Sequence, residues 1–88
     1  VDVDALYVTV QGLAPDDADL LGINSGVRVA KARRGSAFRR GDVLLEINGL
    51  PITSVEAAEA VGVDVLRRRT LDAVVLRGSQ KIRIANRW

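Results

Sequence analysis

Two turn signals that bracket an apolar run constrain the fold of this chain more than any other feature. Gly41-Asp42 precedes the run Val43–Ile47, and Asn48-Gly49 follows it directly. Asn and Gly both adopt a positive φ at low cost, so Asn-Gly after an apolar run is a strong turn signal. The run is almost entirely apolar, which predicts a buried strand. The centre of the chain is therefore expected to be a short buried strand between two tight turns.

Length and composition limit the size and kind of core. The 88 residues fit one domain, and a hydrophobic content of 48% makes intrinsic disorder unexpected. Only Tyr7, Phe38 and Trp88 are aromatic, so the core must consist of Val, Leu, Ile and Ala. The chain has no Met and opens at Val1, which predicts that it is a fragment of a longer protein.

The residue types argue against an enzyme. The sequence has no His and no Cys, so the commonest general base, the thiol nucleophile and the disulfide framework are all missing. The acidic residues are scattered, without the clustered spacing of a metal site. No phosphate-binding glycine loop is present. We therefore predict a non-catalytic domain with no cofactor and no metal, and no apolar window is long enough to span a membrane.

The net positive charge is small, but the arginines occur in clusters. Thirteen Lys and Arg oppose eleven Asp and Glu, for a formal charge of +2. The arginines cluster at residues 33–34, 39–40 and 67–69, between predicted elements. Solvated charge is the ordinary interpretation of such clusters, and an anionic surface or partner is the alternative.

Hydrophobic periodicity and turn residues predict one main helix among several strands. The main helix begins after Ser54, a good N-cap, and carries an apolar stripe made of Val55, Ala58, Val61, Gly62 and Val65. The other predicted elements are a strand over residues 5–10, a short helix over residues 15–21, a turn at 24–26, a strand over 27–32, a loop over 33–41, and a hairpin of strands 71–76 and 81–85. This order predicts an α+β fold with a mostly antiparallel sheet.

The same segments, taken in order, resemble a PDZ domain of the bacterial, circularly permuted type. The strand and turns of residues 41–49 resemble the middle of that family. Residues 8–23 resemble the opening of C-terminal PDZ domains in HtrA/Deg serine proteases, and residues 25–29 and 76–80 match the strand and turn that follow there. The resemblance implies a small, mostly antiparallel sheet or partly open barrel, capped by one main helix and one short helix, with the permuted strand near residues 81–85.

The resemblance also implies a site. PDZ domains bind an extended peptide, usually a protein C-terminus, by adding it as a strand beside a helix. Residues 5–8 stand where the family has its carboxylate-binding loop, with backbone N–H donors at Leu6, Tyr7 and Val8. The implied peptide-binding residues are Leu6, Tyr7, Val8, Thr9 and Val10 on the strand, and Val55, Ala58, Glu59 and Gly62 on the helix. Leu6, Val8, Val61 and Leu66 would form the floor of a pocket for the last side chain. The implied mode of binding requires an unpaired strand edge at residues 7–10.

Two positions depart from the family pattern. Tyr7 stands where the family usually has glycine, and its side chain is expected to crowd or close the carboxylate loop. The connection over residues 33–38 is shorter than in the family, so the small helix there is expected to shrink and Phe38 to fill the gap.

The resulting hypothesis is a peptide-binding regulatory module of an HtrA/Deg-type periplasmic protease. Its expected partners are a protein C-terminus or unfolded segment, the attached protease, and neighbouring protomers. A PDZ domain of a type II secretion component is the alternative within the same class. A small basic nucleic-acid-binding domain is the alternative from another class, although the scarcity of aromatic residues disfavours it.

Overall fold

The structure is a computed structural model that describes residues 1–23 and 26–87. Its elements, in chain order, are β1 (Asp2–Val3), the 3-10 turn η1 (Asp4–Leu6), β2 (Val8–Gly12), α1 (Pro15–Leu21), β3 (Val27–Ala32), β4 (Val43–Ile47), β5 (Leu50–Pro51), α2 (Val55–Arg68), β6 (Thr70–Arg77) and β7 (Gln80–Arg87). The short helix, the strand after it and the central strand have the predicted bounds. The predicted turn at residues 24–26 falls mostly on residues 24 and 25, which lie outside the described part of the chain.

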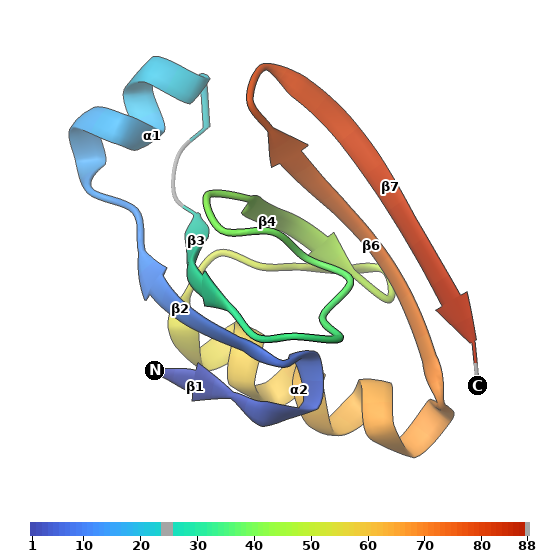
Figure 1. Ribbon diagram of the computed structural model, residues 1–88. Helices are drawn as coiled ribbons and strands as arrows, with labels where there is room; N and C mark the ends of the chain where they lie inside the picture. The colour runs from blue at the N-terminus through green and yellow to red at the C-terminus, as the bar shows by residue number, and fades with distance from the viewer. Residues whose placement is uncertain (24–25, 88) are drawn as a thin grey trace.

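Every strand pairing in the described residues is antiparallel. The strand order is β1-β2-β3-β4-β6-β7, and β5 pairs with β4 beside this path. Figure 1 shows β6 and β7 as a long curved hairpin on one side, β2 and β3 on the other, and the two helices at opposite ends. The α+β fold with a mostly antiparallel sheet is therefore confirmed.

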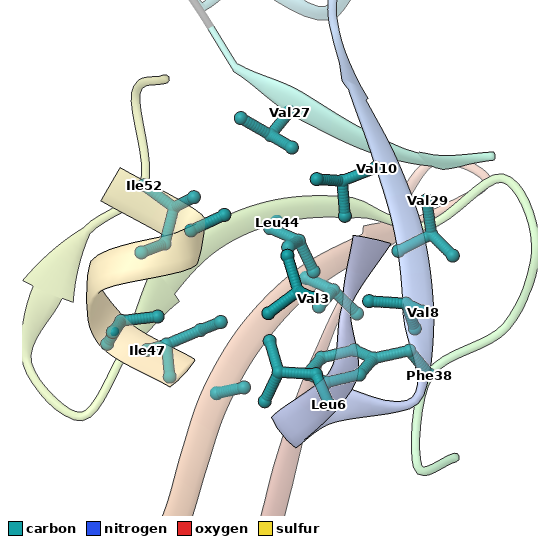
Figure 2. Packing of buried hydrophobic residues seen from close by; sticks show 14 of the residues in the cluster. Val3, Leu6, Val8, Val10, Val27, Val29, Phe38, Leu44, Ile47 and Ile52 are labelled. Carbon is teal, nitrogen blue, oxygen red and sulfur yellow. The ribbon is translucent and has the colours of Figure 1, made fainter. Parts of the chain in front are cut away.

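The core consists of aliphatic side chains from the strands and from one face of α2. Ala58, Val61 and Val65 supply the helical part, as the apolar stripe predicted. Figure 2 shows Phe38 among the buried aliphatic residues beside Leu6, and it is only 3% exposed. The described loop that carries Phe38 contains turns and no helix, and Phe38 fills the core as expected.

The two turn signals also have their predicted conformations. Asn48 and Gly49 have φ values of 51° and 82°, and Gly41 has a φ of 92°. Ser54 caps α2 by accepting a hydrogen bond from the Ala57 N–H at 3.1 Å. These residues serve the backbone, as their types indicated.

The Gly-Asp turn has a second function that the sequence did not reveal. Asp42 is 1% exposed, and its carboxylate accepts two hydrogen bonds from the Arg77 guanidinium, at 3.0 and 2.8 Å. The Arg39 N–H donates a third at 2.9 Å. This contact raises the pKa of Arg77 above its usual range. A buried carboxylate with this many partners ties the turn before β4 to the end of β6.

The strand predicted over residues 5–10 is wrong in its first half. Asp4–Leu6 form a 3-10 turn, and Tyr7 closes that turn with a φ of 55° before β2 begins at Val8. The Tyr7 N–H donates to the Asp4 carbonyl at 3.1 Å. The chain must reverse direction here because β1 pairs antiparallel with β2. The β-forming residue types at these positions gave no sign of this pairing.

Candidate functional site

The candidate site lies where β2 runs beside α2. Val8 and Val10 point into the core from β2, and Ala58 and Val61 do so from α2. The PDZ mode of binding would place an extended segment along the edge of β2 next to the helix.

That edge of β2 is already paired. β1 runs antiparallel to β2, with Asp2 opposite Thr9 and Val3 opposite Val8. The Val1 nitrogen donates to the Val10 carbonyl at 2.9 Å, and the Val10 N–H donates to the Val1 carbonyl at 2.8 Å. The expectation of an unpaired edge at residues 7–10 is therefore wrong, because the chain's own first residues supply the missing strand.

β1 also fills the space between β2 and the helix. Val3 is 4% exposed, and a Cβ placed on Gly62 would lie 3.1 Å from its Cγ1. Glycine at this point of α2 therefore permits close approach of the extended strand. A hollow of about 230 Å³ lies on the other side of this segment, between residues 2–5 and α2, and the residues around it are Asp2, Val3, Asp4, Ala5, Glu59, Gly62, Val63 and Leu66.

The outer side of the groove carries complementary charges. The Thr9 hydroxyl donates to Asp2 Oδ1 at 2.6 Å, and Arg33 Nη2 lies 2.8 Å from Asp4 Oδ1. Lys31 is the β3 partner of Thr9. The hydrogen bond from Thr9, with the charges of Arg33 and Lys31, holds the pKa of the Asp2 carboxyl below its usual value. Acidic side chains on the edge strand thus face a polar and basic surface.

The turn between β1 and β2 occupies the place of the predicted carboxylate loop. Tyr7 adopts the left-handed conformation that explains why glycine is usual at this position, and its side chain is 53% exposed. Ser36 Oγ donates to the Leu6 carbonyl at 2.8 Å and braces the turn from the neighbouring loop. A second hollow of about 470 Å³ opens beside the turn, and its lining includes Leu6, Tyr7, Val65, Leu66 and Leu71.

The sequence-predicted site residues fall into three groups. The first group contacts or borders the N-terminal strand segment and consists of Val8, Thr9, Val10, Glu59 and Gly62. Leu6, Ala58 and Val61 are buried in the core, and Val55 packs partly buried against it. Tyr7 and Leu66 are exposed and border the second hollow. The predicted strand and helix therefore lie side by side, but several of the predicted lining residues face the core.

Sequence reasoning missed the residues that occupy the groove. Val1 and Val3 alternate with Asp2 and Asp4, a period of two that is typical of a half-buried strand. This signal was present, but a segment so short carries little weight alone. Arg33 is solvent-exposed, as expected for its cluster, and it also pairs with Asp4.

Among the described residues, no group of three or more potential ligands lies close enough together to hold a metal ion. None of the helices described is long and apolar enough to cross a membrane.

Comparison of the fold with known structures decides the fold family. The PDZ domain of HtrA3, bound to a phage-derived ligand, superposes with a TM-score of 0.70 at 19% identity and covers 93% of this chain and 82% of that one. The HtrA-type protease AlgW with a decapeptide gives a TM-score of 0.68 at 27% identity over 93% of this chain, and an AlgW variant gives 0.75. The chain has the PDZ fold of HtrA-type proteins.

The PDZ fold accounts for the position of the groove between β2 and α2. The chain spans 27% of the length of the AlgW chains that it matches. No family model matches the sequence, and no curated protein matches it.

Proposed function

We propose that this PDZ domain binds extended peptide segments by strand addition in the groove between β2 and α2, and that β1 leaves the edge of β2 when a segment binds. The observation that carries the proposal is β1, an antiparallel strand on the edge of β2 with a buried side chain against the helix. The groove therefore has the dimensions and hydrogen-bonding groups that an extended segment requires. The HtrA3 domain and AlgW, which share this fold, are described with a ligand and a decapeptide.

The direction of β1 also supports peptide binding by strand addition. Its C-terminal end leads to η1, where the family has its carboxylate loop, so a bound C-terminus would end at this turn. The HtrA3 ligand, FGRWV, ends in valine, and Val3 is the buried residue of β1 nearest the turn. Arg33, which pairs with Asp4, supplies a cation at this end of the groove.

The proposal extends to the protein that contains this domain. We propose that binding regulates or assembles an attached HtrA-type serine protease, in the periplasm. Such control requires that the peptide binds two states of the protease with different affinity. The HtrA-type fold supports this wider role.

Amide chemical-shift mapping with a library of C-terminal peptides tests the proposal. Peptides should perturb residues 6–10 together with residues 55–62. The Asp2→Ala variant, which removes the hydrogen bond between Asp2 and Thr9, should show the same pattern at lower peptide concentration. Perturbation confined to the arginine-rich residues 33–40 would exclude the groove.

The role of the turn is tested with the peptide terminus. Replacing the terminal carboxylate by an amide should weaken binding if the turn donates N–H groups to it. Tyr7→Gly should improve carboxylate binding, since glycine keeps the positive φ and removes the side chain. Loss of affinity in this variant would mean that Tyr7 itself contacts the peptide.

A further inference from the structure

We propose that β1 is an internal ligand of the groove, and that external segments replace it when they share its pattern of an acidic residue followed by a small apolar residue. This inference rests on the proposed function, because it assigns the ligand class of the same groove.

The main chain of β1 makes the backbone hydrogen bonds to β2 that a bound peptide strand would make. Val1 and Val10 exchange both hydrogen bonds, which makes them a hydrogen-bonded pair of the antiparallel ladder. Such pairs alternate along a ladder, so Asp2 and Thr9 form a non-hydrogen-bonded pair and Val3 and Val8 the next hydrogen-bonded one. An external segment in this register would satisfy the same groups of β2.

The apolar part of the pattern comes from Val3. Its side chain is 4% exposed and lies against Gly62, while the Ala5 Cβ lies 3.4 Å from a Cβ placed on the same glycine. The space between the turn and the helix is thus closed on two sides. A small branched side chain fills it, and a large aromatic one would have to displace the turn.

The acidic part of the pattern comes from Asp2. Its carboxylate accepts the 2.6 Å hydrogen bond from Thr9, next to Lys31 on β3 and close to Arg33. A basic residue at this position would face two cations and leave the Thr9 hydroxyl without its acceptor. The groove therefore selects an acidic side chain at the residue before the buried valine.

β1 can be replaced because it lies at the end of the sheet. In the described residues it pairs with β2 alone, and Val1 is 56% exposed. Local opening of such a segment requires less free energy than global unfolding. While β1 is bound, the apparent affinity for an external segment is reduced by the fraction of molecules with an open groove.

A reversible disulfide between β1 and β2 tests whether β1 must leave the groove before a peptide binds. The chain contains no cysteine, so Asp2→Cys combined with Thr9→Cys introduces one possible pair. The two positions face each other in a non-hydrogen-bonded pair, where the Cα separation of about 4.5 Å suits a disulfide. The probe is the synthetic peptide Ser-Gly-Ser-Val-Asp-Val with a free carboxylate, and binding is measured by calorimetry on the full chain. The control is the Asp2→Ser, Thr9→Ser variant.

The reduced protein should bind the probe at least about tenfold more tightly than the oxidised protein, since only the reduced form can release β1. The serine control should bind equally with and without reductant. Equal binding to the oxidised and reduced forms would overturn the inference, because the probe would then bind without displacing β1.

The pattern is tested on the native chain with three probes that differ in one residue. The peptide ending in Val-Asp-Val should bind about three- to tenfold more tightly than those ending in Val-Ala-Val or Val-Lys-Val, because it alone replaces the Asp2 hydrogen bond. Thr9→Val should abolish this preference, and the Ala probe should bind this variant at least as tightly as it binds the native chain, because the variant also lacks the hydrogen bond that holds Asp2.

The outcomes separate the two proposals. Equal affinity for the three probes in the native chain would overturn the ligand pattern and leave the proposed function intact. Failure of every probe and of the C-terminal library to bind the reduced cysteine variant, in which the Asp2–Thr9 hydrogen bond is absent, would overturn the proposed function and this inference with it.

Discussion

Asn48 shows how one turn residue connects three elements. Its Nδ2 donates to the Thr70 carbonyl at 2.9 Å and to Asp64 Oδ2 at 3.2 Å, and its Oδ1 accepts from the Asp72 N–H at 2.8 Å. The side chain therefore joins the end of β4 to the end of α2 and the start of β6. The same residue has a positive φ, which asparagine adopts more easily than most residues do.

Two substitutions at Asn48 separate the contribution of its side-chain hydrogen bonds from that of its backbone conformation. Asn48→Gly removes the side-chain hydrogen bonds and keeps the backbone conformation, so we expect a loss of about 2 kcal/mol in the free energy of unfolding. Asn48→Ala also strains the backbone and should cost about 1 kcal/mol more. Urea unfolding of both variants gives the two values. Equal destabilisation would mean that the positive φ adds no strain.

At the scale of elements, the most buried ion pair fixes β4 relative to β6. Asp42 and Arg77 are separated by 35 residues in sequence, and each lies at one end of a paired strand. By contrast, the contact of Asp17 with Arg28 between α1 and β3 is exposed and 3.8 Å long.

Removing the buried Asp42 carboxylate should therefore lower the free energy of unfolding much more than removing the exposed Asp17 carboxylate. Asp42→Ala leaves Arg77 and the Arg39 N–H without their acceptor, and should cost about 3–5 kcal/mol. Asp17→Ala should cost at most about 1 kcal/mol. Denaturant unfolding measures both, and Arg77→Ala in the Asp42→Ala background should cost less than it does alone. Additive losses would show that the two side chains do not stabilise each other.

The β6–β7 hairpin carries an ion pair that makes stability depend on pH. Two hydrogen bonds from Arg83, at 3.0 and 2.9 Å, lower the pKa of Asp72 below its ordinary value of 3.8. A carboxyl whose pKa is lowered by folding stabilises the fold above its unfolded pKa. This contribution is lost as the pH falls through the native pKa.

The Asp72→Asn variant measures this contribution. The difference in unfolding free energy between the native chain and this variant should be constant from pH 7 to about 5 and should shrink below about 4. Arg83→Gln should remove the pH-dependent part and keep the carboxyl. A difference that stays constant down to pH 2 would contradict the lowered pKa.

At the scale of the whole molecule, the two ends of the sheet differ. One end is the two-residue strand β1, and the other is the eight-residue strand β7. Lys81, Arg83 and Arg87 lie along β7, and like charges of this kind oppose pairing with a second copy of the same edge. The end that exchanges strands most easily is therefore the one beside the helix.

Hydrogen exchange tests the difference in local stability. The Val10 N–H bonds to Val1, whereas the Val29 N–H bonds to Asp42, both at 2.8 Å. Opening of β1 alone exposes Val10, so its amide should exchange faster than that of Val29 although both side chains are buried. Oxidation of the Asp2→Cys, Thr9→Cys variant should slow the exchange of Val10 and leave Val29 unchanged. Equal protection of the two amides in the native chain would mean that β1 opens only with the whole fold.

Signals that depend only on neighbouring residues predicted the structure correctly. Asn48-Gly49, Ser54 and the apolar stripe of α2 encode backbone conformation or one-sided burial through neighbouring residues, and they were correctly assigned. The site was predicted only in outline. Thr9 and Gly62 do lie at the groove, but Leu6, Val8 and Ala58 face the core. Core and groove positions share the same apolar residue types, so residue type alone does not distinguish them.

By itself, the sequence determined the α+β fold, the turns on either side of β4, the bounds of α1 and the start of α2, because positive φ values, caps and periodicity are properties of adjacent residues. Only the tertiary structure decided that Val1–Val3 occupy the edge of β2 and that Asp42 meets Arg77. Both contacts join segments whose side chains fit only after the sheet has formed. The pairing of a strand edge depends on which backbone reaches it in space, and such pairing leaves only a weak pattern in two or three residues.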